Sequence, residues 1–429
     1  MKSNRSLVKI LFYILVIIAP FSLILPQFFP TGVFSILRDG IVILLSFLFL
    51  LRLVRMKFIN ISLFEFILFL FIIYGFFHIF ISLVDLPTSL MKFRVIYFYP
   101  ILALLAILYF KNLKVEGKNE VSLFIKIFIF QGFLMTVFAI LEIIFGDSLL
   151  MLLYQERFFD IPRNLLGQNG IRVVSLMYNP IILGIFMNIF LVFLLYSGKN
   201  NFIISRNVTL VLKLILIPLN IVITFLTYSR ISVIIAILIF IAYILLNYKW
   251  LFKLKNAVIT IFLVLLLITS TQYLVDFQGD NLTKRYGNIT TDTFKENARI
   301  ENWNEYLQGI YSKGNIHILW GGGLGTSNSS NKEQTEIIKK VENSYVTYLG
   351  ETGIIGFLLF IFILLRFLVL IFRKFDNNKE QAKIILQVLL VLIIASFSND
   401  TFHNNPFSFY FWILYFYTEI TNPRQINRR

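Results

Sequence analysis

Long apolar segments alternate with short polar segments along the whole chain. Each apolar segment is close to the roughly 20 residues that an α-helix needs to cross a hydrocarbon core. One such segment would fit a signal peptide or a single anchor, but about twelve of them predict an all-α, polytopic integral membrane protein. The predicted spans are residues 7–25, 33–51, 63–83, 93–110, 123–145, 174–196, 210–227, 231–246, 257–273, 345–372, 384–397 and 407–420.

The composition excludes a soluble domain. Hydrophobic residues make up 58% of the 429 residues and charged residues only 14%, whereas soluble domains carry about 25% charged residues. The chain contains no cysteine, which excludes disulfides and thiolate metal sites. The first apolar segment has basic residues in front of it, like a signal peptide, but no small-residue cleavage site follows before Pro26. We therefore interpret residues 7–25 as the first span.

The net charge of +16 is explained by topology. Lys and Arg accumulate in the cytoplasmic loops of membrane proteins. Every second predicted loop of this chain is basic, and the intervening loops around Pro26, Asp85 and Asn404 are much less so. This alternation predicts a cytoplasmic location for both termini. The positive net charge therefore indicates the lipid bilayer as the partner, and not nucleic acid.

The domain organisation is predicted to be a single membrane domain over residues 1–429, with two long extracytoplasmic loops at 146–171 and 276–344. The second loop contains several aromatic and aliphatic residues, which is unlike a disordered tether. Long loops in compact proteins are usually functional or disordered. Within this loop, residues 301–310 are predicted to form a short helix near the outer face, and the loop is expected to carry part of the site.

Five arginines lie on the predicted outer side, where topology does not explain positive charge. Each lies at a predicted span boundary or at the edge of the long loop: Arg38, Arg94, Arg172, Arg230 and Arg299. The planar guanidinium binds phosphate oxygens through two parallel hydrogen bonds, so a ring of arginines suits a lipid-linked phosphate or pyrophosphate. The alternative is that each arginine reaches the headgroups or pairs with a local carboxylate, as Arg38 could with Asp39.

Three stretches on this side carry recognisable motifs. Arg172 precedes an Asn-Pro pair at the mouth of a span, and Ser229-Arg230 opens an apolar run. Arg299 and Trp303 precede a Gly-rich turn, a Glu-Asn-Ser-Tyr segment at 342–345 and a Glu-x-Gly-x-x-Gly motif that opens a membrane helix. In this order, the three stretches resemble the O-antigen polymerase and ligase family of bacterial polysaccharide assembly. The resemblance covers mainly residues 170–360.

This resemblance implies a GT-C-like membrane glycosyltransferase in the bacterial cytoplasmic membrane, active on its outer face without nucleotide, metal or other cofactor. It would polymerise oligosaccharide repeat units, carried on undecaprenyl pyrophosphate as donor and acceptor, into an O-antigen or capsule. A chain-length regulator and a flippase of the same pathway are the expected protein partners. The residues that it indicates are Arg172, Arg230 and Arg299 for the pyrophosphate charge, Glu342 as the base, and Arg38, Arg94, Ser229, Trp303, Asn343 and Tyr345 for substrate binding.

Other interpretations remain open for several of these residues. Glu342 could simply favour the start of the next helix through the helix dipole, and Glu351 is expected to pack near the interface. The Gly-rich segment at 321–325 lacks the Gly-Lys-Ser/Thr ending of a nucleotide-binding loop, so we predict a tight turn. His78 and His403 lack partners with metal-ligand spacing, and we predict no metal site.

Two other functions compete with the polymerase. A ligase would transfer the finished glycan to a lipid core; ligases of this family commonly carry His at the position of Glu342, which favours a polymerase. A transporter or flippase would place charges along a path through the midplane. The predicted spans 231–246 and 257–273 carry no charge, and the informative residues gather at one mouth, which favours an enzyme.

Overall fold

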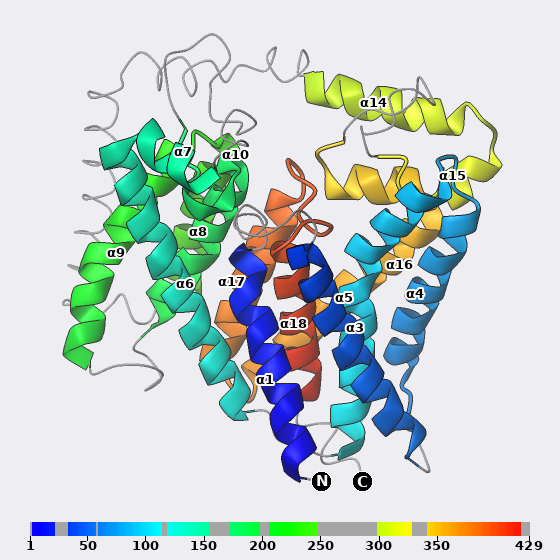
Figure 1. Cartoon of the computed structure of the whole chain (residues 1–429), viewed down its shortest axis with the longest axis horizontal. Helices are drawn as coiled ribbons and strands as arrows, with labels where there is room; N and C mark the ends of the chain where they lie inside the picture. The colour runs from blue at the N-terminus through cyan, green and yellow to red at the C-terminus, as the bar shows by residue number, and fades with distance from the viewer. Residues whose placement is uncertain are drawn as a thin grey trace.

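The computed structural model describes residues 2–21, 33–56, 59–113, 118–154, 172–197, 206–247, 298–327 and 341–421. Every regular element in these ranges is helical (Figure 1). The elements are α1 (Lys2–Ile18), η1 (Ala19–Phe21), α3 (Val33–Val54), α4 (Leu63–Phe80), α5 (Leu86–Leu113), α6 (Lys118–Phe145), α7 (Asp147–Tyr154), η3 (Ser175–Met177), α8 (Pro180–Tyr196), α9 (Arg206–Leu226), α10 (Arg230–Leu246), α14 (Ala298–Tyr311), α15 (Ile316–Trp320), α16 (Ser344–Phe375), α17 (Lys379–Ala395) and α18 (Phe407–Ile420).

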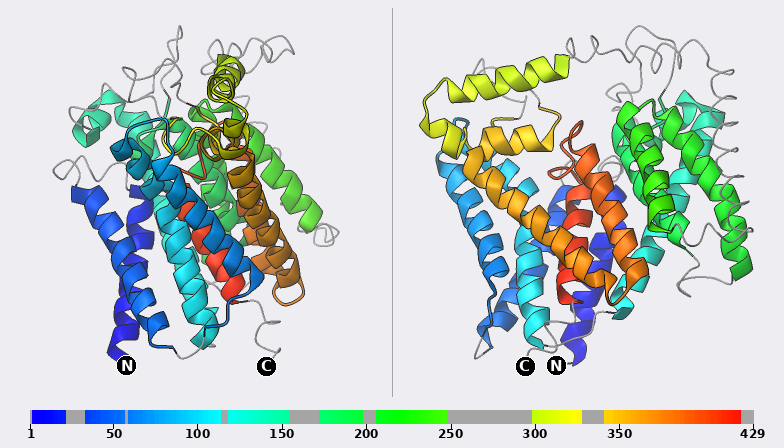
Figure 2. Two further views of the ribbon diagram at one scale, coloured as in Figure 1. Left: turned by 90° about the vertical axis from the view of Figure 1, so that its right-hand side faces the viewer. Right: turned by 180° about the vertical axis from the view of Figure 1, so that it is seen from behind.

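The long helices form one bundle, with α17 and α18 near its middle (Figures 1 and 2). On one side α5 packs against α3, α4 and α18, and on the other side α8 packs against α9, α10 and α17. The helix α18 is buried on nearly all of its faces, as expected for a central helix that is hydrophobic all round. The helix α14 lies across one end of the bundle.

The surface of the bundle is that of a membrane protein. Four of the described helices are long and apolar enough to cross a membrane: Leu63–Phe80, Leu86–Lys111, Lys126–Phe145 and Ser344–Phe375. Large apolar side chains such as Phe47, Phe77 and Phe80 are more than half exposed, which a soluble monomer rarely tolerates over a wide area. Each predicted span corresponds to a helix except 257–273, which lies outside the described residues, so the count of twelve stays a prediction.

The two ends of the bundle differ in the chemistry of their connections. The start of α1 and the end of α18 lie at the same end, together with the basic turn between α16 and α17 (Figure 1). We call this the inner end, after the orientation that the loop charges predict, and the opposite end, which carries α14, the outer end. At the inner end, buried cations have partners: Arg366 binds Glu419 at 3.1 Å and Lys111 binds Glu65 at 2.7 Å.

Among the helix boundaries that differ from the predicted spans, two bear on the candidate site. The helix α5 begins at Leu86 rather than residue 93, so Arg94 lies about two turns inside the helix rather than at its boundary. The segment predicted as 174–196 begins with the short η3 turn, and α8 starts at Pro180. There Asn179 accepts hydrogen bonds from the amides of Ile181 and Ile182, the arrangement of an N-cap followed by proline. The predicted helix at 301–310 is confirmed as part of α14.

Candidate functional site

Arg172 and Arg230 meet at the turn between α9 and α10. The Nε of Arg172 donates to the carbonyl of Thr227 at 2.9 Å, and the amide of Val173 donates to the carbonyl of Leu226 at 3.0 Å. Arg230 is the first residue of α10, three positions after Thr227. The strand-like stretch after the first long loop is thus bonded to the end of α9, and two arginines from distant parts of the sequence converge there.

The local sequence explains the position of Arg230. Tyr228 has a positive φ of 50° and reverses the chain after α9. The hydroxyl of Ser229 caps α10 by accepting a hydrogen bond from the amide of Ser232, as expected for a serine at an N-cap. Ser229 was predicted to bind substrate, but its side chain is buried and engaged in this cap. It therefore holds the start of α10, where Arg230 lies, and its role in substrate binding stays a prediction.

Arg299 and Glu342 form an ion pair at the same end of the bundle. The Nη2 of Arg299 lies 2.9 Å from Oε2 of Glu342, and the two side chains are 41% and 34% exposed. The Nη1 of Arg299 also donates to the carbonyl of Ser398 at 3.3 Å, just after the end of α17. A cation from α14 and a carboxylate that precedes α16 are therefore held side by side at the surface.

The beginning of α16 is bonded to the end of α17 beside this pair. Asn343 accepts hydrogen bonds from the amides of Tyr345 and Val346, and its own amide group donates to the carbonyl of Phe397 at 3.0 Å. The hydroxyl of Tyr345 donates to the carbonyl of Ile393 at 2.9 Å. Both residues were predicted to bind substrate. In the structure Asn343 is buried and holds the backbone beside Glu342, and Tyr345 is half-buried; their roles in substrate binding stay predictions.

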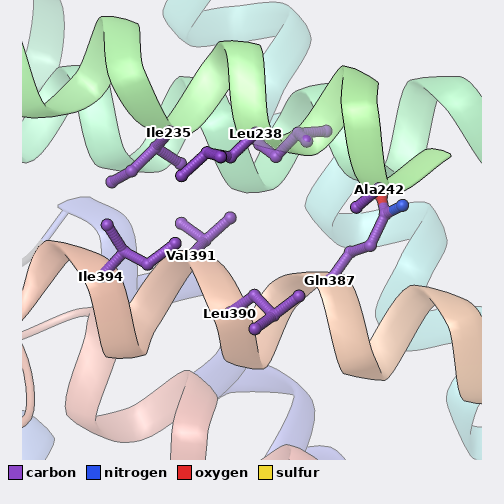
Figure 3. A pocket seen from close by; sticks show the side chains of 8 residues that line it. Ile235, Leu238, Ala242, Gln387, Leu390, Val391 and Ile394 are labelled. Atoms are coloured by element: carbon purple, nitrogen blue, oxygen red, sulfur yellow. The ribbon is translucent and has the colours of Figure 1, made fainter. Parts of the chain in front are cut away.

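The register of α10 against α17 sets the level of Arg230 relative to the end of α17. Ile235 faces Ile394, and Ala242 faces Gln387, so the two helices run antiparallel (Figure 3). Arg230 lies five residues outward from Ile235, and Ser398 lies four residues outward from Ile394. At a helical rise of about 1.5 Å per residue, the two distances along the bundle axis differ by a fraction of a helical turn. Arg230 and the Arg299–Glu342 pair therefore lie at the same level of the outer end.

Trp303 lies on α14, next to the ion pair. It is half-buried against a small apolar cluster formed by Tyr306, Ile310 and Val341. The hydroxyl of Tyr306 is within 3.0 Å of the Thr326 hydroxyl, and burial raises the pKa of Tyr306 well above its usual value. This cluster packs α14 against the bundle, and Trp303 stays partly exposed; its role in substrate binding stays a prediction.

The Gly-rich segment is a tight turn, as predicted, and it packs on a kink in α16. Gly353 has a φ of 63° and interrupts the helix. A Cβ on Gly321 would collide with the backbone of Glu351 and Gly353, and one on Gly323 would collide with Ser82. Only glycine permits such close backbone approach at positive φ. The amides in this turn bind protein carbonyls and the carboxylate of Glu351, so the turn is part of the scaffold.

With this geometry established, a comparison with protein families is informative. Residues 214–361 match the family model described as O-Antigen ligase. We refer to these residues, which are similar to that family, as the family domain. The match confirms the family resemblance over about a third of the 429 residues. A search of curated proteins found no match.

The family domain holds most of the candidate site. It contains Arg230, Arg299, Glu342, the Gly-rich turn and the kink of α16. Arg172 lies outside the matched segment, as do the carbonyls at the end of α17 that position Arg299 and Asn343. The site is therefore assembled from the family domain together with elements on both sides of it.

Beneath the family domain's Gly-rich turn lies a buried ionic cluster. The Nζ of Lys92 lies 3.6 Å from Glu351, 3.4 Å from Asp400 and 3.1 Å from the Ser327 hydroxyl. The Nδ1 of His403 lies 2.5 Å from the other carboxylate oxygen of Asp400. Burial alone would raise the pKa of Asp400, but the contacts with His403 and Lys92 outweigh burial and hold it at about 2. This cluster ties α5, α16 and the α17–α18 connection together.

Sequence reasoning did not find this cluster. It placed Glu351 near the interface and assigned no role to Lys92, Asp400 or the pairing of His403. The structure confirms that Glu351 packs, because its carboxylate accepts hydrogen bonds from Gly325 and Ser327. Lys92, Glu351 and Asp400 lie at or near the ends of predicted spans on the same side. Ionisable groups at such positions need buried partners, and this could have indicated the cluster.

Arg38 and Arg94 form a separate group with Asp39. Nη2 of Arg38 lies 2.9 Å from Asp39, and Nη1 of Arg94 lies 3.3 Å from it. The local pairing of Arg38 with Asp39 was the alternative interpretation of this arginine, and the structure contains that pair. The described residues therefore divide the five arginines into a group of three around α10 and α17, and a pair on α3 and α5.

Metal binding finds no support among the described residues, where no group of three His, Asp or Glu side chains is arranged to hold an ion. His403 is engaged with Asp400, and His78 is stacked between Tyr74 and Trp320. The outer end carries guanidinium groups and the accessible carboxylate of Glu342, and α14 adds the exposed carboxylates of Glu301 and Glu305.

Proposed function

We propose that this chain is a membrane glycosyltransferase that polymerises undecaprenyl-pyrophosphate-linked oligosaccharide repeat units into a surface polysaccharide. The family match supports O-antigen polymerase or ligase activity in general. What supports the proposal further is that Arg172 and Arg230 lie at the turn between α9 and α10 and that the Arg299–Glu342 pair lies beside the end of α17, all at the outer end of the bundle. Cations and a carboxylate are the two kinds of group that transfer from a pyrophosphate requires.

The reaction assigns a separate task to each group. A hydroxyl oxygen of the acceptor sugar attacks the anomeric carbon of the donor glycan. The bond between that carbon and the pyrophosphate oxygen breaks, and its electron pair leaves with the pyrophosphate. Arg172, Arg230 and Arg299 stabilise the charge that develops there, while Glu342 accepts the proton of the attacking hydroxyl.

The pairing of Arg299 with Glu342 is consistent with these two separate tasks. Both side chains are about one-third exposed or more, so the pair is accessible to a substrate, and a pair of this exposure is worth only about 0–1 kcal/mol. A pyrophosphate can therefore displace the carboxylate from the guanidinium at little cost. The displaced Glu342 stays within reach of the acceptor, because Asn343 fixes the backbone beside it.

The proposed location of the enzyme follows from the orientation of the bundle that the loop charges predict. We place the enzyme in the bacterial cytoplasmic membrane with both termini in the cytoplasm and the site at the outer face. Donor and acceptor are then glycans that a flippase has delivered to that face, and a chain-length regulator is the expected further partner. The energy for the transfer comes from cleavage of the pyrophosphate link.

A reconstitution experiment tests the proposal against a ligase, the alternative that the description of the family match favours. The purified chain is placed in liposomes with undecaprenyl-pyrophosphate-linked repeat units as the sole glycan. A polymerase forms a ladder of products under these conditions. Products that form only after a lipid-core acceptor is added identify a ligase instead, and the absence of product in both assays contradicts glycosyl transfer.

A further inference from the structure

The two short helices of the long outer loop expose opposite kinds of side chain. The exposed face of α14 is polar and is formed by Glu301, Asn304, Glu305 and Gln308. The exposed residues of the five-residue α15 are apolar: Ile316, Leu319 and Trp320 are 65%, 49% and 41% exposed. Their spacing of i, i+3 and i+4 places them on one face of the helix. A cluster of large apolar side chains that a protein leaves exposed marks a contact with a partner or a membrane.

Aromatic contacts determine the level of α15 along the bundle. The ring centroid of Trp320 lies 5.7 Å from that of Tyr74 and 6.4 Å from that of His78, and both pairs are stacked. Tyr74 and His78 precede Phe80, the end of α4, by six and two residues, which is about 9 Å and 3 Å along a helix. Trp320 therefore lies beside the last two turns of α4 and not beyond its end (Figure 1).

These last turns of α4 belong to the lipid-facing surface. Leu63–Phe80 is one of the four helices that are long and apolar enough to cross a membrane. Near its outer end, Phe76, Phe77 and Phe80 are all at least half exposed. A bilayer that surrounds these side chains also reaches α15, because Trp320 is stacked on the same two turns. The exposed face of α15 thus continues a surface that already faces hydrocarbon.

The turn that follows α15 satisfies the condition for irregular backbone at this depth. Non-helical backbone in a membrane must be buried in protein, where its polar groups find partners. Residues 321–327 are all buried. The amide of Gly322 donates to the carbonyl of Gly350 at 2.7 Å, and the amide of Gly323 donates to the carbonyl of Glu351 at 2.9 Å. The turn is therefore compatible with a position below the headgroups.

We infer that the exposed face of α15 inserts into the lipid leaflet at the outer end of the bundle and anchors the long outer loop in the membrane. Five residues are too few to cross the bilayer, but interfacial helices bury their apolar face only about 5–10 Å deep. Tryptophan prefers the boundary between headgroups and hydrocarbon, where Trp320 lies. Lys313 is exposed three residues before Ile316, and its long side chain can reach the anionic headgroups.

The anchor also constrains α14, which carries Arg299. Four residues separate the end of α14 at Tyr311 from the start of α15 at Ile316, and α14 contacts both α15 and α16. With α15 held in the leaflet, α14 lies across the outer end of the bundle with its polar face towards water (Figures 1 and 2). The anchor does not depend on the reaction proposed above, and it can be tested without an activity assay.

Spin labels on single cysteines test the anchor, because the chain has no cysteine of its own. Ile316→Cys and Leu319→Cys place the label on the exposed face of α15, where the substitution removes little packing. Phe77→Cys, exposed on α4, is the lipid reference, and Gln308→Cys, on the polar face of α14, is the water reference. The full chain is reconstituted in liposomes. Collisions of each label with oxygen and with nickel ethylenediaminediacetate are measured by power saturation of the electron paramagnetic resonance signal.

We expect the two labels on α15 to behave like the label of Phe77→Cys. Oxygen, which dissolves in hydrocarbon, should collide with them frequently. The polar nickel chelate should collide with them at least about tenfold less often than with the label of Gln308→Cys, because transfer of a polar molecule into an apolar environment is costly.

The same measurement shows whether something other than lipid meets α15. Collisions with the nickel chelate as frequent as those of Gln308→Cys place the face in water and overturn the inference. Low accessibility to both probes shows that another segment or a second copy of the chain covers the face, which also overturns it. If Phe77→Cys itself admits the chelate, the end of α4 lies outside the bilayer and the anchor fails with it.

Discussion

At the scale of single residues, the candidate site depends on where three guanidinium groups are anchored. Arg172 is held by a carbonyl at the end of α9, Arg230 by the capped start of α10, and Arg299 by a carbonyl after α17. Each arginine comes from a different segment, and backbone carbonyls fix the guanidinium groups of Arg172 and Arg299. A site that is preorganised in this way requires the planar fork of arginine and not only a positive charge.

Replacement of these arginines by lysine therefore tests the geometry of the site. We expect Arg230→Lys and Arg299→Lys to lower glycan polymerisation by about 10²–10³-fold, the usual effect of removing one donor to a developing anion. Product ladders, normalised to the amount of protein in the membrane, measure the effect. Arg373→Lys, at an exposed position of the inner end, is the matched control. Full activity in both outer variants would remove the pyrophosphate-binding role.

Glu342 and Glu351, both in the family domain, should respond differently to amidation. Glu342→Gln is expected to lower activity by about 10²–10⁴-fold, as for loss of a general base, with little change in thermal stability because its ion pair is partly exposed. Glu351→Gln should chiefly lower the unfolding temperature, since the buried Lys92 loses one of its two carboxylate partners. Activity assays and thermal unfolding of both variants, with the exposed Glu301→Gln as control, check this order; the reverse order would assign the base to Glu351.

At this scale, the sequence predicted residue types better than residue roles. The arginines and Glu342 were chosen because their chemistry suits a pyrophosphate and because they occur in a recognisable order. Ser229 and Asn343 were chosen from the same motifs, but they cap α10 and α16. A motif records which residues occur together, and it does not distinguish a side chain that contacts the ligand from one that holds its neighbour in place.

At the scale of elements, the sequence was most informative about long apolar helices. Their existence follows directly from hydrophobic length, and the described helices match the predicted spans. It was least informative about the irregular connections at the outer end, where η3, the Gly-rich turn and the kink of α16 determine how the site is built. These depend on contacts between segments far apart in the sequence, such as the hydrogen bond from Gly323 to Glu351.

The kink of α16 gives a sharp prediction at this scale. Gly353→Ala should destabilise the protein by at least roughly 1–3 kcal/mol, because alanine is strained at positive φ and its Cβ would collide with the carbonyl of Leu319. Gly40→Ala, inside α3 with no atom near the added methyl group, should be neutral or stabilising. Thermal unfolding of both variants in detergent measures the difference. Equal unfolding temperatures would show that the kink is not required for the fold.

The connection between α17 and α18 should make stability dependent on pH in the acid range. The pKa of Asp400 is held at about 2, below its ordinary value of 3.8, so its stabilising contribution is complete above pH 4 and is lost as the pH falls towards 2. The shift corresponds to on the order of 2 kcal/mol. Thermal unfolding from pH 6 to pH 2 should therefore show Asp400→Asn less stable than the unsubstituted chain at pH 6 and nearly equal to it at pH 2. Parallel curves over this range would contradict the assignment.

At the scale of the whole molecule, the bundle concentrates its accessible chemistry at one end. The ion pairs of the inner end, such as Arg366–Glu419 and Lys111–Glu65, are largely buried and hold helices together. The Arg299–Glu342 pair at the outer end is open to solvent, and α14 lies beside it. An enzyme that receives lipid-linked substrates from one face of a membrane needs this asymmetry, whereas a transporter needs accessible polar groups along a path between both faces.

The orientation of the bundle is the last prediction, and the proposed function depends on it. The basic α16–α17 turn, which includes Arg373, Lys374 and Lys379, should face the cytoplasm, and the α14–α15 connection should face outward. Because the chain has no cysteine, Ser312→Cys and Asn377→Cys each introduce a single thiol at an exposed turn, far from the proposed catalytic groups. A membrane-impermeant maleimide should label Ser312→Cys in intact spheroplasts, and Asn377→Cys only after the membrane is permeabilised. The opposite pattern would place the arginines on the side where no translocated glycan arrives, and the proposed polymerisation could not occur there.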